Sequence, residues 1–247
     1  MTQNGGRRRQ KLAGTPASAG VPLSRALSKL GILSRAQAVQ AIRAGRVSVD
    51  GVVVRNAAVL VVPERARVLV DGAERRRAAW RTIVFHKPRG VVTTRRDPEG
   101  RRTVFDVLGA EGEGLVAVGR LDLATSGLLL LTSDTRLADW ITDPVHQVSR
   151  VYAVTVRGRI AAAQLAALPG VTLRKASARE SHLTVELREG RNRQVRRMFD
   201  AIGHEVTRLK RVKLGSLELE DLAPGQFRDI LRAEIPVAFP GAPVREV

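Results

Sequence analysis

The sequence predicts an α+β fold in two parts. The first is a small helix-helix-hairpin domain in residues 21–72, and the second is a larger domain in residues 81–242 whose sheet is mixed and largely antiparallel. Three observations predict this arrangement. Helical periodicity precedes an Asp-Gly turn signal in the first part, short alternating strands interleave with helical stretches in the second, and no internal repeat is evident. A chain of 247 residues is long enough for both domains.

The N-terminal domain is predicted from its apolar spacing. Helices are expected over residues 23–30 and 35–44, because large apolar side chains recur on one face of each and a glycine follows each. Asp50-Gly51 then separates two valine-rich stretches, which indicates a hairpin with a type I′ turn. The flanking segments are interpreted as a disordered basic arm (1–20), a charged linker (73–80) and a short tail (243–247).

The larger domain is predicted element by element from periodicity. Alternation or continuous apolar character predicts strands, and spacing of three and four residues predicts helices. The expected strands are residues 83–85, 128–131, 151–156, 183–187, 206–209 and 217–219. Three helices are expected. One begins after Asp134, and the other two cover residues 161–168 and 192–202.

The charge balance points to a polyanionic partner. The chain has 42 Lys and Arg against 24 Asp and Glu, a net charge of +18. Residues 1–80 hold 15 basic and 4 acidic side chains, so the excess is greatest in the N-terminal part. An excess of this size most often serves nucleic-acid binding. Binding to a membrane surface is less favoured, because the sequence contains no basic amphipathic helix with bulky apolar anchors.

Several classes of chemistry are excluded by composition. The chain has no cysteine, which rules out disulfides, Cys-zinc sites and thiol catalysis. The four histidines lack metal-ligand spacing, so no metal is expected. Residues 1–20 hold no apolar stretch of signal-peptide length, and no other segment is long enough to span a membrane, so a soluble, cytoplasmic protein is expected. The protein is also expected to be a monomer.

The most informative segment is residues 119–134, Gly-Arg-Leu-Asp-Leu-Ala-Thr-Ser-Gly-Leu-Leu-Leu-Leu-Thr-Ser-Asp. Four consecutive leucines predict a buried strand, which is too short to span a membrane. Asp122 lies on the loop that leads into this strand, beside Arg120. A carboxylate on a loop fixed to a hydrophobic core can be aimed and kept partly dry, as a nucleophile or general base requires.

This segment closely resembles the signature of the RsuA/RluB-type ribosomal RNA pseudouridine synthases, and the resemblance extends over about residues 22–240. It implies that Asp122 is the catalytic residue and that no cofactor or metal takes part. Lys87-Pro88-Arg89-Gly90 resembles the family's Asn-Lys-Pro-x-Gly strand, with His86 in place of Asn. The implied partner is ribosomal RNA, free or in a pre-ribosomal particle, with the large subunit preferred.

Residues 27–51 resemble the S4 RNA-binding domain, from Leu-Ser-Lys-Leu-Gly-Ile-Leu-Ser-Arg through Ile-Arg-Ala-Gly-Arg-Val-Ser-Val-Asp-Gly. In S4 domains the second helix and the strand after it face RNA. The resemblance therefore implies that Arg35, Arg43 and Arg46 contact RNA. A solvated helix face is the alternative for these three side chains.

Two further motifs complete the predicted site. Arg150-Val151-Tyr152 resembles the family's Lys-x-Tyr strand, which implies that Tyr152 stacks on the target uracil and is a candidate for removal of the C5 proton.

Residues 189–199, Glu-Gly-Arg-Asn-Arg-Gln-Val-Arg-Arg-Met-Phe, resemble the family's third motif. Arg196 then matches an arginine that ion-pairs with the catalytic carboxylate and keeps it ionised. Further substrate or RNA contacts are expected from Arg120, Asn192, Arg193 and Arg197, with Arg193, Arg196 and Arg197 on one basic helix face.

The implied reaction isomerises uridine to pseudouridine. Asp122 attacks the flipped nucleotide, either at ribose C1′ or at uracil C6, and both sites of attack stay open. Two other classes of function are weighed against it. One is a non-catalytic RNA-binding ribosome-assembly factor, and the other is a sequence-specific DNA-binding protein with a helix-turn-helix surface.

Overall fold

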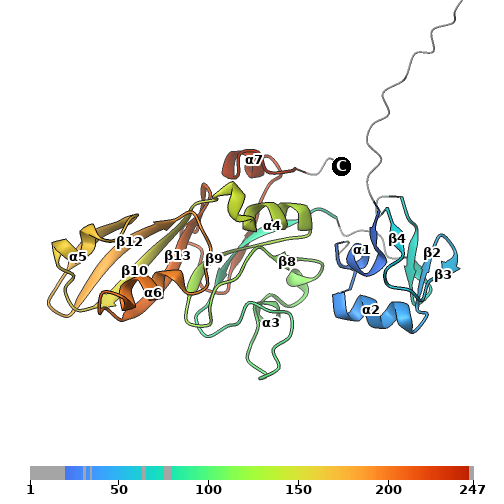
Figure 1. The fold of residues 1–247 in the computed structure, drawn as a ribbon, viewed down its shortest axis with the longest axis horizontal. Helices are drawn as coiled ribbons and strands as arrows, with labels where there is room; N and C mark the ends of the chain where they lie inside the picture. Colours follow the sequence, from blue (N-terminus) through green and yellow to red (C-terminus); the bar gives the residue numbers. More distant parts are fainter. Residues whose placement is uncertain (1–19, 30–31, 34, 63–64, 75–78, 245–247) are drawn as a thin grey trace, which may run out of the picture. The chain divides into compact units, whose positions relative to one another are not determined.

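The computed structural model describes residues 20–29, 32–33, 35–62, 65–74 and 79–244. The chain divides into two compact units, Met1–Arg76 and Arg77–Val247 (Figure 1). Each unit has its own hydrophobic core. Residues 1–19 of the predicted disordered arm, Gly31 after the first predicted helix, and half of the predicted linker lie outside the described residues.

The first unit packs two helices against two small sheets, β1-β4 and β3-β2-β5-β6. Leu23 and Leu27 of α1 meet Ile42 of α2 and Val47 of β2 in one buried cluster. Asp50 and Gly51 both have positive φ, as a type I′ turn requires. The predicted hairpin is therefore confirmed. The elements are β1 (Val21–Pro22), α1 (Leu23–Lys29), α2 (Arg35–Arg43), β2 (Val47–Val49), β3 (Val52–Val53), β4 (Leu60–Val61), β5 (Val68–Val70) and β6 (Ala73–Glu74).

The second unit is built on one long sheet with the strand order β11-β12-β10-β13-β9-β7-β15. Every described pairing within it is antiparallel except that of β13 with β9. The predicted α+β fold with a mixed, largely antiparallel sheet is therefore confirmed. The strands are β7 (Thr82–Lys87), β8 (Val116–Ala117), β9 (Ser126–Thr132), β10 (Arg150–Arg157), β11 (Val171–Ala176), β12 (Glu180–Leu187), β13 (Val206–Leu214), β14 (Leu217–Glu218) and β15 (Phe227–Asp229).

Helices cover both faces of the β7–β9 half of the sheet (Figure 1). Leu128 and Leu130 of β9 pack into the cluster formed with α4 and α7, whereas Leu129 and Leu131 pack into the cluster formed with α3. The leucine run is continuous because neither face of this strand meets water. The helices are α3 (Val104–Leu108), η1 (Gly109–Gly112), α4 (Thr135–Thr142), η2 (Pro144–His146), α5 (Ala162–Ala166), α6 (Gln194–Asp200) and α7 (Glu234–Ala238).

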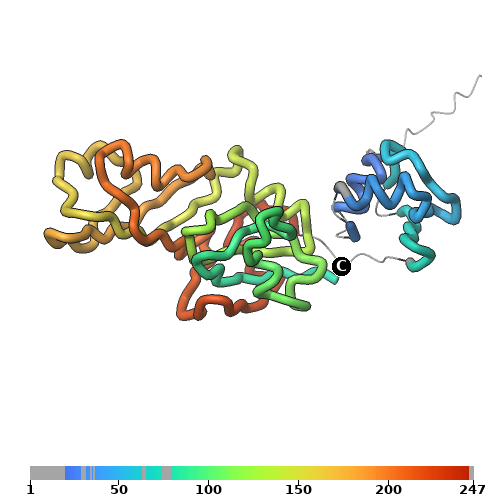
Figure 2. Tube along the Cα trace, turned by 90° about the horizontal axis from the view of Figure 1, so that it is seen from below, coloured from blue at the N-terminus to red at the C-terminus, as the bar shows by residue number. Residues whose placement is uncertain are grey.

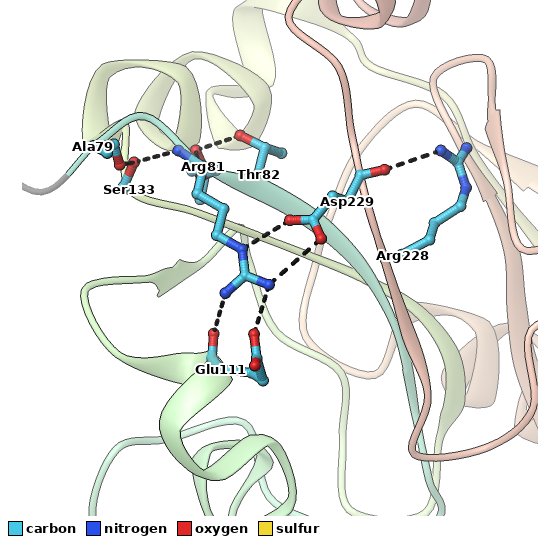
Figure 3. A network of polar contacts seen from close by, with 8 residues as sticks. Ala79, Arg81, Thr82, Glu111, Ser133, Arg228 and Asp229 are labelled. Carbon is cyan, nitrogen blue, oxygen red and sulfur yellow. Dashed lines mark hydrogen bonds and ion pairs between the residues drawn. The ribbon is translucent and has the colours of Figure 1, made fainter.

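The start of β7 is fixed by Arg81 (Figure 3). Its guanidinium donates to Asp229 of β15 at 2.7 Å and forms an ion pair with Glu111 of η1 at 2.7 Å. Its amide donates to Ser133 Oγ, just after β9. Hydrogen bonds from the guanidinium to the two carboxylates raise the pKa of Arg81 above its ordinary value. One side chain therefore links a sheet edge to the segment before β8.

The parallel pairing of β9 with β13 joins the two halves of the sheet, and β13 can be followed as the orange tube in Figure 2. Gly127 faces Arg211 across this pairing with φ of +107°, and a Cβ atom there would lie 2.2 Å from the Arg211 carbonyl oxygen. Only glycine therefore allows the two strands to approach this closely. The loop that carries Asp122 leads directly into this junction.

No helix in the described part of the chain combines the length and the apolar character needed to cross a membrane.

Candidate active site

A cavity of about 390 Å³ opens beside the junction of β9 with β13. Its walls come from the loop of residues 119–125, from β10 and β13, and from residues 187–195. The predicted residues Arg120, Asp122, Tyr152, Asn192 and Arg193 all line it, although they lie far apart in the sequence. The structure thus brings most of the predicted site together at one place.

The loop of residues 119–125, called here the Asp122 loop, is held by its backbone. Five consecutive carbonyl groups, from residues 121 to 125, each accept a hydrogen bond. The donors are Thr93 Oγ1 to Leu121 O, Lys87 Nζ to Asp122 O and Thr125 O, Gly90 N to Leu123 O, and Arg196 Nη2 to Ala124 O. The Asp122 side chain takes no part in this network, since no described residue donates to its carboxylate or pairs with it.

Lys87 is the most buried of these donors, with no exposed surface. Its ammonium donates to Pro88 O at 3.0 Å, Asp122 O at 3.1 Å and Thr125 O at 2.8 Å, which uses all three of its N–H groups. Burial lowers the pKa of Lys87 to about 8, and the charge of Asp122 opposes that shift. A buried cation thus fixes the loop on which the carboxylate lies.

Arg196 supports the same loop from α6. It is 9% exposed and donates to Val206 O at 2.9 Å and to Ala124 O at 3.2 Å, while its buried Nε has no partner. Burial lowers the pKa of Arg196, and the nearby Asp122 opposes this shift. Arg196 and Asp122 are therefore close enough to interact electrostatically. However, the expected direct ion pair is replaced here by hydrogen bonds to the backbone.

The remaining predicted residues are placed in different ways. Arg120, Asn192 and Arg193 lie at the rim of the cavity, and Tyr152 is half-buried in its wall. The predicted basic helix face is wrong, because α6 begins after Arg193, which has a left-handed conformation. Arg196 points inward with the apolar side of α6, while Arg197 faces solvent outside the cavity lining.

The three predicted S4 arginines lie in the other unit. Arg35 and Arg43 are exposed there. Arg46 pairs with Asp71 at 3.2 Å, and both of these side chains are about half exposed. The role of the three arginines toward RNA therefore stays a prediction.

Two carboxylates line the cavity, and they differ in their partners. Glu189 pairs with Arg191 at 3.0 Å and also accepts from Gln194. Asp122 has no partner among the described residues, so it is the carboxylate of this cavity that is available for chemistry. Within the same described part, no three His, Asp or Glu side chains gather as a metal site would require.

Comparison with known proteins identifies the family to which this geometry belongs. Residues 81–201 match the family model of RNA pseudouridylate synthases, and residues 21–66 match the S4 domain. An uncharacterized RNA pseudouridine synthase of Aquifex aeolicus is 35% identical over 233 residues, which are 89% of this chain and 94% of that protein. The chain belongs to the RNA pseudouridylate synthase family.

Other members of this family are similar over most of the chain. The ribosomal large subunit pseudouridine synthase B of Haemophilus influenzae is 39% identical over 83% of this chain, and this chain spans 62% of that protein's length. A crystal structure of a pseudouridylate synthase superposes with a TM-score of 0.60 at 29% identity, covering 87% of this chain and 98% of the other. The predicted family, enzyme class and S4 domain are confirmed.

Three buried cations, Lys87, Arg150 and Arg211, are not predicted as site residues by the sequence. Lys87 falls within a turn motif, and the motif does not reveal its hydrogen bonds. Arg211 lies on β13, is 3% exposed and lines the cavity. A signal for Arg211 is present in the sequence, because it follows the buried Leu209 by two residues on one strand face.

Proposed function

We propose that this chain isomerises a uridine of large-subunit ribosomal RNA to pseudouridine, with the Asp122 carboxylate as nucleophile. One observation carries the proposal: the Asp122 side chain lines the cavity and has no partner among the described residues. The other carboxylate of the cavity, Glu189, is already paired with Arg191. The name of the Haemophilus relative supports the large subunit as the source of the RNA.

The chemistry follows from the positions of these groups. A flipped uridine enters the cavity, and Asp122 attacks it at C1′ or at C6. The N1–C1′ bond breaks, the uracil turns, and a C5–C1′ bond forms. The C5 proton passes to a base, N1 takes up one proton in place of its bond to C1′, and Asp122 is released, so that the product is an isomer of uridine.

The other residues serve this step by orientation. Tyr152, half-buried in the cavity wall, supplies a surface on which the uracil stacks, and its hydroxyl is the candidate acceptor for the C5 proton. Lys87 and Arg196 hold the Asp122 loop through its carbonyl oxygens. Orientation of this kind is worth many orders of magnitude in rate when the reacting atoms are already aligned.

Tritium release from RNA labelled at uridine C5 tests the proposal. We expect release by the wild type and a loss of about a thousandfold or more for Asp122→Asn, because the amide is a poor nucleophile. Asp139→Asn, an exposed position on α4, is the matched control and should retain full activity. If the wild type binds ribosomal RNA but releases no tritium, the chain is instead a non-catalytic assembly factor.

The modified position is identified by mapping pseudouridine in total RNA from a strain that lacks this protein. A site lost from large-subunit RNA supports the proposal, and a site lost from small-subunit RNA contradicts its choice of subunit. Location in the cytoplasm and a monomeric state belong to the same proposal, and are measured by cell fractionation and light scattering.

A further inference from the structure

Two buried arginines of the cavity have no counter-ion among the described residues. Arg150 on β10 is 9% exposed and Arg211 on β13 is 3% exposed, and both line the cavity. Arg211 faces Tyr152 across the two strands, and alternation places Arg150 on the same face of β10 as Tyr152. The three side chains therefore belong to one wall.

The hydrogen bonds of both arginines go to backbone carbonyls. Arg150 donates to Val148 O at 2.7 Å and Ile141 O at 3.3 Å, and Arg211 Nε donates to Leu128 O at 2.7 Å. Arg211 Nη2 is buried without a partner, and no described carboxylate pairs with either guanidinium. Burial and the charge of Arg211 together lower the pKa of Arg150.

Two like charges buried side by side are costly unless an anion compensates them. The cavity's own carboxylates do not do so, because Glu189 is paired with Arg191 and Asp122 is free for chemistry. A uracil offers only neutral carbonyl groups. A phosphodiester offers a full negative charge and two oxygen atoms whose geometry fits a guanidinium fork.

We propose that Arg150 and Arg211 form a phosphate-binding subsite inside the cavity, which holds a phosphodiester next to the flipped uridine. This inference rests on the proposed function, since it is the RNA substrate that brings the phosphate. The subsite draws the flipped nucleotide in and fixes its sugar relative to Asp122. The rim arginines Arg120 and Arg193 then contact the more distant backbone.

Binding of large-subunit RNA at several salt concentrations is the first test, and it needs no turnover. Arg150→Gln and Arg211→Gln should each weaken binding at least about tenfold and reduce the slope of log affinity against log salt by about 0.7, the value for one single-stranded phosphate contact. Arg150→Lys keeps the charge and should retain the wild-type slope. Arg157→Gln is the matched control, because this exposed arginine at the far end of β10 pairs with Glu205 away from the cavity.

Neutral linkages provide the second test. In an RNA that the wild type modifies, a methylphosphonate replaces the phosphodiester on the 5′ or the 3′ side of the target uridine. One of these two neutral linkages should lower the affinity of the wild type by about the same factor as Arg150→Gln or Arg211→Gln does. The same linkage should cause no further loss of affinity in those two variants. If neither neutral linkage lowers the affinity of the wild type, the subsite is disproved. It is also disproved if the neutral linkage lowers the affinity of the glutamine variants by the same factor as that of the wild type.

The two proposals fail in distinguishable ways. Absence of tritium release by the wild type overturns the isomerase reaction, whereas wild-type release with unchanged salt slopes in both glutamine variants overturns only the subsite. Thermal unfolding establishes that each variant is folded. Should a glutamine variant not fold, the methylphosphonate measurement on the wild type alone decides.

Discussion

At the scale of single residues, the site depends on buried cations that hold backbone rather than side chains. Lys87 and Arg196 donate to carbonyl oxygens of the Asp122 loop from distant parts of the sequence. Charge-assisted hydrogen bonds are stronger than neutral ones, and a loop whose carbonyl groups are paired has little freedom to move. The Asp122 side chain is therefore aimed by groups that bind its backbone and not its carboxylate.

Lys87→Met tests this view, because methionine fills a similar volume but donates no hydrogen bond. We expect the single-turnover rate to fall about tenfold to a hundredfold, since a shift of about 1 Å in a reacting group has an effect of that size. RNA affinity should stay within about threefold, because the charge that is removed is fully buried. Lys175→Met, an exposed position on β11, is the control. An unchanged rate in Lys87→Met would show that the loop is held without it.

Because of the lowered pKa of Lys87, we expect the reaction rate and the free energy of unfolding to change in opposite directions as the pH rises. The pKa of Lys87 in the fold is about 8, against 10.5 for a free lysine. As the pH rises through 8, the amine loses one of its three donors and the rate should fall. Between pH 8 and 10.5 the folded form binds fewer protons than the unfolded form, so the contribution of Lys87 to stability rises. Comparing both profiles with those of Lys87→Met isolates this residue, and parallel profiles in the two proteins would contradict the prediction.

At the scale of elements, the approach of β9 to β13 determines the site. Gly127→Ala places a methyl group 2.2 Å from the Arg211 carbonyl oxygen at a φ of +107°. We expect this variant to lose about 2–5 kcal/mol of unfolding free energy, from backbone strain and overpacking together. Gly203→Ala has a φ of +79° with nothing within 4 Å, so it carries the strain without the clash and should lose about 1–2 kcal/mol. Chemical unfolding measures both, and equal losses would contradict the argument.

Some elements and site residues could be predicted from the sequence, and others could not. The leucine run of β9 and the type I′ turn at Asp50-Gly51 were predictable, because each depends on a few neighbouring residues. The start of α6 was predicted two residues early, since helical periodicity does not reveal the left-handed conformation of Arg193. Asp122 could be found within a local motif. The roles of Lys87 and Arg211 could not, because their partners are carbonyl groups that only the sheet brings near.

At the scale of the whole molecule, the net charge of +18 is divided between two units with separate cores. The exposed Arg35 and Arg43 lie on the unit that matches the S4 domain, while the cavity lies in the other unit. We therefore expect binding and chemistry to be separable in this protein. RNA affinity should fall steeply with salt, because contacts to phosphates release counterions.

The double variant Arg35→Gln/Arg43→Gln in the full chain tests this separation. We expect weaker binding of ribosomal RNA by about tenfold or more, with a salt slope reduced by about 0.7 to 0.9 for each phosphate that the variant no longer neutralises. The single-turnover rate at saturating RNA should be unchanged, because the Asp122 loop and the cavity are intact in the other unit. Arg174→Gln, an exposed arginine on the outer strand β11, serves as the control. A fall in the saturated rate, with affinity unchanged, would mean that the S4 unit acts on the chemical step rather than on capture of the RNA.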